Sequence, residues 1–202
     1  MATEKLETEI RQDQITNAAL GLIAAEGVSE LSMAKLADRV GLVPSAIYRH
    51  FKSKDEVLDA TIAHIRERLT NNVRSARKDT SDAVECLHML LASHIELVRQ
   101  NRGILHIVFS DSVYSGRPQR KQRMYQAVAT YLKGVAAIIA DGQAHGLICR
   151  DADAHTLAVM FLGLIQPAAF LSHMSNGEFD AAEHAENAWK VFSACLTVAQ
   201  RS

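Results

Sequence analysis

Two short segments with the apolar spacing of a helix lie on either side of Gly41-Leu42-Val43, and this arrangement constrains the fold most. In residues 33–40 and 44–51, apolar side chains recur every three to four positions, as on one face of a helix. Glycine at 41 is a natural helix end, and proline at 44 suits a first helical position because its missing N–H would be unpaired there. The sequence therefore predicts a helix-turn-helix over residues 32–51.

The rest of the chain shows the same helical spacing, with little of the alternation typical of strands. A stripe from Ile15 ends at Gly27, and a capping box, in which Ser53 caps and Glu56 reaches back, opens a long helix. Further helices are expected over about 82–100, 104–109 and 124–142, from Asp151 or Asp153 onward with a kink at Pro167, and from Asp180 to Val198, while 110–118 is typical of a loop. The predicted fold is all-α, with a three-helix domain at 1–55 and a helical bundle at 56–202.

Composition and charge narrow the function classes. The 202-residue chain has a net charge of −1, and its first 60 residues hold ten acidic against seven basic side chains, so any nucleic-acid contact needs locally placed cations. The three cysteines form no CxxC pair, which predicts free thiols. The start of the chain has no signal pattern, and the apolar run 157–171 is shorter than the ~20 residues that cross a bilayer. We expect a cytoplasmic protein without a membrane contact.

The second helix of the motif has a polar outer side. Ile47 and Phe51 supply its inward face, which leaves Ser45, Tyr48, Arg49 and His50 outside. In a helix-turn-helix this helix enters the DNA major groove, so these groups are candidates for contacts with base edges or phosphates. Lys54 stands at the start of the next helix, where its charge and the free N–H groups can both hold a phosphate. The sequence therefore predicts a DNA-binding domain.

The spacing of the first 60 residues resembles a known family. Ile15-xx-Ala18-Ala19-xx-Leu22-xxxx-Gly27, Leu36-Ala37-xxx-Gly41 and Tyr48-xx-Phe51-xx-Lys54-xxx-Leu58 look like the DNA-binding domain of TetR-family transcriptional regulators, over about residues 9–68. The resemblance implies a homodimer on a pseudo-palindromic operator, usually a repressor released by a small molecule. The remaining residues fit the family's ligand-binding and dimerisation bundle by length and helix count.

The resemblance also implies individual DNA contacts. Contacts with the DNA backbone fall on Ser32, Tyr48, His50 and Lys54, and positions near the bases on Ala34, Val43, Pro44, Ser45 and Ala46. The sequence departs from the usual pattern at Val43, where a serine is common, and at Ala46, where threonine or serine is common. Both changes remove hydroxyls, so we expect apolar contacts with thymine methyl groups from Pro44 or Ala46.

The C-terminal part has two sets of candidate residues. The all-apolar stretch 157–171 predicts burial on several sides, and packing against a partner subunit through a four-helix interface is the first choice. The residues chosen for that interface are Leu164, Ala168, Trp189 and Phe192. Alternatively, part of the stretch lines a cavity for an apolar or amphipathic ligand. Its candidate residues are Met160, Phe161 and Phe170 with the polar His88, His94, His106, Tyr125 and Gln166.

Other chemistry is weakly supported. Cys86 with His88, His94 and His106, and Asp141 with His145 and Cys149, lack the spacing of a known metal site, so no metal or other cofactor is expected. The basic run Arg117, Arg120, Lys121 and Arg123 is typical of a solvated helix start. No catalytic motif is present, which argues against an enzyme. A DNA-bound adaptor whose C-terminal domain binds a protein rather than a ligand remains the alternative.

Overall fold

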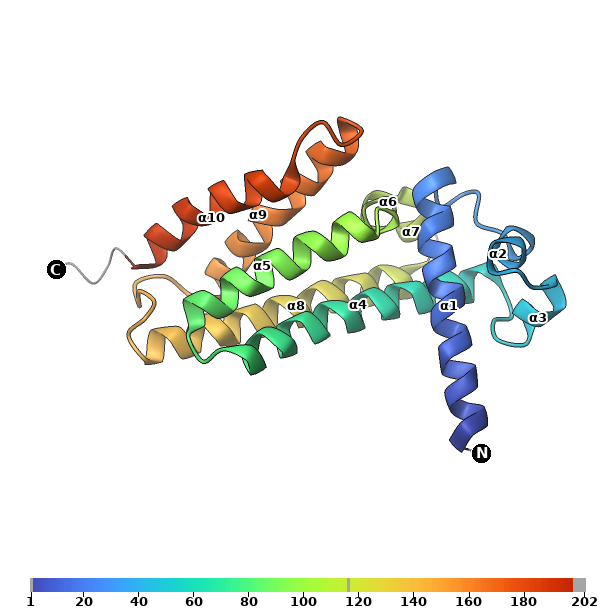
Figure 1. The fold of residues 1–202 in the computed structure, drawn as a ribbon, viewed down its shortest axis with the longest axis horizontal. Helices are drawn as coiled ribbons and strands as arrows, with labels where there is room; N and C mark the ends of the chain where they lie inside the picture. The colour runs from blue at the N-terminus through green and yellow to red at the C-terminus, as the bar shows by residue number, and fades with distance from the viewer. Residues whose placement is uncertain (1, 116, 198–202) are drawn as a thin grey trace. The chain divides into compact units, whose positions relative to one another are not determined.

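A computed structural model describes residues 2–115 and 117–197, and within these ranges the regular structure is helical (Figure 1). The predicted end of the last helix at Val198 lies outside the described residues. The expected loop at 110–118 contains one short helix. The helices are α1 (Ala2–Glu26), α2 (Met33–Val40), α3 (Pro44–Tyr48), α4 (Lys54–Asp79), α5 (Ala83–Gln100), α6 (Gly103–Phe109), α7 (Asp111–Tyr114), α8 (Pro118–Ala144), α9 (Ala154–Met174) and α10 (Ala181–Thr197). The prediction of an all-α fold is confirmed.

The chain forms two compact units. Unit 1 comprises the chain up to Glu67 together with residues 101–127, and unit 2 comprises residues 68–100 and the chain from Val128. The long helices α4 and α8 therefore contribute residues to both units. The sequence prediction placed a domain boundary after residue 55, within the first turn of α4, and unit 1 extends to Glu67 in the same helix.

Unit 1 is built around the apolar stripe of α1. Ile15, Ala19 and Ile23 are fully buried, and α2 and α6 both pack on this helix. The contact with α6 is so close that a Cβ atom on Gly103 would lie 2.2 Å from the carbonyl oxygen of Leu20. Only glycine fits there, because a backbone carbonyl cannot move aside as a flexible side chain can.

Unit 2 packs α5, α9 and α10 against one another, with the second halves of α4 and α8. Its core includes Leu87, Leu91 and Phe161, all without exposed surface. One polar pair lies in this core: His94 Nδ1 is 2.8 Å from the hydroxyl of Tyr131. Burial lowers the pKa of His94 to about 4 and raises that of Tyr131, so both groups are neutral at pH 7.

The apolar helix α9 buries one face and exposes the other. It continues through Pro167 and is 21 residues long, longer than the apolar run in the sequence. By length and composition alone it is the one described helix that qualifies to cross a membrane. This is weak support for a membrane span, because core helices of soluble proteins pass the same test, and the buried face of α9 packs on α5 and α10.

Candidate nucleic-acid interface

The turn between α2 and α3 is set by Gly41 and Pro44. Gly41 has φ +71°, in the left-handed region that favours glycine. The N–H of Leu42 donates to the carbonyl of Ala37 at 2.8 Å, which closes the end of α2. Val43 is extended and Pro44 opens α3, as predicted. These local choices produce two short helices with a tight connection.

The short helix α3 is seated by two apolar side chains. Ile47 has no exposed surface and Phe51 is 4% exposed, so the inward face is the predicted one. Of the ten candidate DNA contacts, those exposed to solvent are Ala34, Val43, Pro44, Ser45, Tyr48, Arg49 and Lys54, and those half-buried are Ser32, Ala46 and His50. Since none of them is buried, the motif presents a mixed apolar and polar surface with Tyr48 half-exposed at 53%.

Two of the half-buried candidates have one polar atom that is not available to DNA. The hydroxyl oxygen of Ser32 accepts the N–H of Lys35 at 3.2 Å, which caps α2. Its O–H remains a possible donor to a phosphate. The Nδ1 atom of His50 is buried with no hydrogen-bond partner among the described residues, so its ring has only Nε2 to offer to DNA.

The start of α4 is capped in a slightly different way from the prediction. Ser53 Oγ accepts the N–H of Glu56 at 3.3 Å, as expected. The Glu56 carboxylate, however, accepts the N–H of Lys52 at 2.6 Å rather than that of Ser53. Lys54, the first residue of α4, is exposed beside this cap.

Lysines in unit 1 differ in how far their charge is compensated. Lys35 on α2 lies 2.7 Å from Glu26 and 2.8 Å from Glu30. Hydrogen bonds to Glu26 and Glu30 raise the pKa of Lys35, and the hydrogen bond from Lys35 lowers that of Glu30. This lysine is therefore a poor phosphate ligand, whereas Lys54 stands at a helix N-terminus that favours anions.

The basic run at the start of α8 is only partly the solvated helix start that the sequence predicts, because one of its arginines is buried and three are ion-paired. Arg120 is 3% exposed and binds Asp55 and Asp59, while Arg117 and Arg123 each bind one of the same aspartates. Arg117, Lys121 and Arg123 are exposed, as expected, so Arg120 is the buried residue of the run. The sequence missed the pairing because the partners lie about 60 positions away.

The candidate ligand residues do not gather around one cavity. His106 and Tyr125 belong to unit 1, where Tyr125 is 72% exposed. In unit 2, His94 and Phe161 are core residues, and His88 stacks on Trp189 and lies 2.9 Å from Glu186. The remaining candidates are on the exposed face of α9: Met160, Gln166 and Phe170.

The residues chosen for a dimer interface lie mostly inside unit 2. Ala168, Trp189 and Phe192 are buried and Leu164 is half-buried. A helical stripe identifies an apolar face but does not tell whether the same subunit or another one covers it. The apolar side chains left uncovered on α9 and α10 are different ones: Val159, Met160, Phe170, Leu171, Met174 and Val191.

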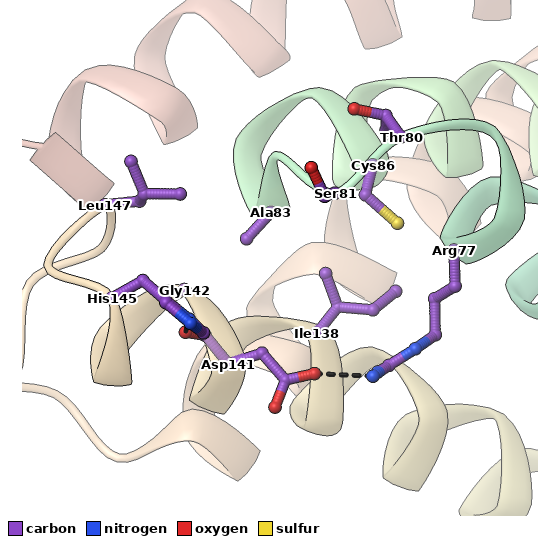
Figure 2. Close-up of a pocket in the computed structure, with 10 residues that line it drawn as sticks. All are labelled: Arg77, Thr80, Ser81, Ala83, Cys86, Ile138, Asp141, Gly142, His145 and Leu147. Atoms are coloured by element: carbon purple, nitrogen blue, oxygen red, sulfur yellow. Dashed lines mark hydrogen bonds and ion pairs between the residues drawn. The ribbon is translucent and has the colours of Figure 1, made fainter.

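Two pockets among the described residues of unit 2 are lined by residues other than the eight ligand candidates. One, of about 240 Å³, is drawn in Figure 2: Arg77 of α4 reaches Asp141 of α8 at 2.5 Å, and the other lining residues include Cys86, Ile138, His145 and Leu147. Burial raises the pKa of the Cys86 thiol. The other, of about 300 Å³, is lined by Leu91, Ile95, Glu96, Arg99, Ala185 and Glu186, among others.

Comparison with protein-family models agrees with this geometry. Residues 15–61 match the model of bacterial regulatory proteins of the tetR family, and residues 64–195 match that of the C-terminal region of YsiA-like proteins. The chain belongs to the TetR family of transcriptional regulators. The matches make this TetR-family protein a DNA-binding regulator, as the helix-turn-helix predicted.

Curated relatives of this regulator include nucleoid occlusion factors. It is 23% identical to nucleoid occlusion factor SlmA of Vibrio vulnificus over 185 residues, covering 91% of this chain and 94% of the relative. Over a shorter region of 121 residues it is 27% identical to SlmA of Actinobacillus pleuropneumoniae, covering 59% of this chain and 60% of the relative.

Solved structures share the fold of this TetR-family protein. The fatty acid degradation regulator FadR of Bacillus halodurans has a TM-score of 0.78 at 19% identity, covering 90% of this chain and 94% of that one. FadR of Bacillus subtilis, in complex with stearoyl-CoA, has a TM-score of 0.75 at 21% identity, with coverage of 91% and 98%. A TetR/AcrR-family regulator of Thermobifida fusca is 26% identical with a TM-score of 0.67, with coverage of 91% and 96%.

Proposed function

We propose that this TetR-family regulator is a repressor that binds a pseudo-palindromic operator as a homodimer and is released by a small apolar or amphipathic ligand. The observation that supports the DNA contact is the exposure of α3: two buried side chains seat this helix, while Ser45 and Tyr48 on its outer face and Arg49 at its C-cap are exposed. A recognition helix needs this combination of firm seating and polar exposure to enter the major groove.

Selection of binding sites from a pool of random DNA duplexes tests this function. The purified full-length protein should enrich an inverted repeat whose half-sites are spaced by about one helical turn, ~34–36 Å, or multiples of it. Light scattering should find an even number of protomers on each selected duplex. Transcription in vitro from a promoter that overlaps the site should fall when the protein is added. An unrepeated site bound by one protomer would contradict the homodimer.

Base recognition by α3 is proposed to include thymine methyl groups. Val43 and Pro44 are exposed and Ala46 is half-buried, so apolar surface adjoins the polar face. Thymine differs from uracil only by the methyl group, and its apolar contact contributes to major-groove recognition. Replacing thymine by uracil at one position of each half-site should weaken binding several-fold. The idea fails when uracil is tolerated at every thymine position of the selected operator.

The homodimer is proposed to form through the uncovered apolar surface of α9 and α10. Val191, at 68% exposure, is the most exposed large apolar side chain of α10. Val191→Glu should shift the protein toward monomers and weaken operator binding, because a charge buried in an interface is costly. Tyr125→Glu, at a similarly exposed position in unit 1, is the control and should remain dimeric. Sedimentation velocity measures both, and an unchanged dimer in Val191→Glu would exclude this surface.

The ligand is proposed to enter unit 2. The pocket of Figure 2 combines a polar edge, Arg77 and Asp141, with the apolar Ile138 and Leu147, which suits a small amphipathic molecule. Its volume of about 240 Å³ is somewhat below that of common ligand pockets, which start at ~300 Å³, so the molecule must be small. The likeness to a regulator that holds stearoyl-CoA concerns the fold alone. Thermal-shift titration with small carboxylic acids tests the site, and Ile138→Trp should abolish any shift.

A DNA-bound adaptor is the second candidate function. The relatives named as nucleoid occlusion factors favour it, because that name describes no small-molecule effector. The two functions differ in what binds the C-terminal domain. A small molecule would release the repressor from DNA, whereas a protein partner would join the adaptor on DNA. Release of the operator by a low-molecular-weight fraction of a cell extract supports the ligand-responsive repressor. A complex that instead recruits a protein while it stays on DNA supports the adaptor.

A further inference from the structure

Three arginines near the start of α8 bind two aspartates in the first turns of α4, all within unit 1. Arg120 is central: its Nε lies 2.7 Å from Asp59 Oδ1 and its Nη2 lies 3.0 Å from Asp55 Oδ1. The same Nη2 donates to the backbone carbonyl of Asp55 at 3.1 Å. Arg117 Nη2 lies 2.6 Å from Asp55 Oδ2, and Arg123 Nη1 lies 2.8 Å from Asp59 Oδ2. We call these five residues the arginine clamp.

The clamp buries its central charge. The Arg120 side chain is 3% exposed, whereas Arg117 and Arg123 are about half-exposed. Burial works to lower the pKa of Arg120, but hydrogen bonds to Asp59 and Asp55 raise it, so the guanidinium stays charged. A buried ion pair is often no more stable than apolar residues of similar volume. Stabilisation of the fold alone therefore does not explain why these ion pairs are buried. A requirement for a defined geometry at the start of α4 explains them better.

The clamp defines the position of the first turn of α4. Asp55 and Asp59 are four residues apart, so they lie on one face of the helix in successive turns. A planar guanidinium that binds both carboxylates restricts rotation and sliding of that turn, since its donors have a fixed fork geometry. Lys54 directly precedes Asp55, so its backbone is held by the same contacts.

The clamp also changes the charge beside the proposed DNA contact. Two carboxylates next to Lys54 would repel DNA phosphates if they were uncompensated. The three arginines more than balance the two aspartates, so the cluster as a whole is cationic. The fixed position of the first turn and the positive charge of the cluster both favour the binding of a phosphate at the start of α4.

We propose that Arg120 is a positioning residue for DNA binding, which grips Asp55 and Asp59 and so holds Lys54 and the N-terminal amides of α4 against the DNA backbone. The inference rests on the proposed phosphate contact of Lys54. It assigns a role in DNA recognition to a residue of α8, a helix outside the helix-turn-helix motif.

A double-mutant cycle on the full-length protein tests the proposal. Arg120→Gln, Lys54→Ala and the double variant are titrated with a selected operator duplex at several salt concentrations. Arg120→Gln should weaken binding about tenfold or more and should reduce the salt dependence as Lys54→Ala does, because the phosphate contact is lost in both. Lys54→Ala should then have little further effect in the Arg120→Gln background. Independent, additive effects would overturn the proposal.

The controls separate positioning from folding and from the proposed function. Arg99→Gln removes an exposed ion pair with Glu96 in unit 2 and should leave operator affinity unchanged. Circular dichroism reports folding, and if Arg120→Gln does not fold, the cycle is repeated with Arg120→Lys, which keeps the charge without the fork. If Lys54→Ala alone has no effect, the phosphate contact and the inference both fail. If it has an effect that merely adds to that of Arg120, only the inference fails.

Discussion

Gly103→Ala should destabilise the protein on the order of 3 kcal/mol, as overpacking of a tight contact does. The new Cβ would lie 2.2 Å from the backbone oxygen of Leu20, so α6 must move away from α1 within unit 1. For a chain of this size the loss corresponds to a fall in melting temperature of about 6–12 °C. Thermal unfolding followed by circular dichroism measures it.

Gly21→Ala is the matched control, since it is also a helical glycine of unit 1. Its Cβ would lie 2.9 Å from the guanidinium of Arg39, at the end of a flexible side chain that can move aside. Alanine is the better helix former by up to ~1 kcal/mol, so this variant should be as stable as the native protein or more stable. Equal stability of the two alanine variants would contradict the close approach of α6 to α1.

Lys54→Ala should weaken operator binding by about tenfold with little change in sequence preference. A phosphate contact carries charge but no sequence information, so its loss acts on all operator sequences alike. The slope of log affinity against log salt should become less steep by about 0.9 for each lysine removed. Fluorescence anisotropy titrations between low and moderate salt measure both quantities.

Lys35→Ala is the control for this second prediction. Lys35 lies on α2 and is paired with Glu26 and Glu30, so its charge is already compensated. Its removal should leave the salt dependence nearly unchanged. An equal loss of slope in both variants would show that the overall charge of unit 1, rather than a contact at the start of α4, governs binding.

The helix-turn-helix was predictable because its signals are local. The apolar spacing around Ile47, the glycine at 41 and the proline at 44 act through backbone conformation within a few residues, and each appears in the structure as expected. The cap at Ser53 also follows from neighbouring residues. The candidate DNA contacts come from the same short stretch, so their exposure followed once the buried face was identified.

In unit 2 the sequence determined the apolar faces but not what covers them. Trp189 and Phe192 have the spacing of an interface stripe, yet they pack inside the subunit, and Val191 between them is exposed. The candidate ligand residues are dispersed for the same reason. A histidine such as His94 has the same sequence signal whether it lines a cavity or bonds to a buried tyrosine.

By itself, the sequence determined the helical fold, the turn at Gly41 and the polar outer face of α3, because these depend on neighbours along the chain. Only the tertiary structure decided that Arg120 is buried against Asp55 and Asp59, and that Arg77 meets Asp141 at a pocket. These partners are separated by about 60 positions. The reason is physical. An arginine carries the same charge whether it is solvated or buried against carboxylates, and only the packing of helices that are distant in the sequence decides which environment it has.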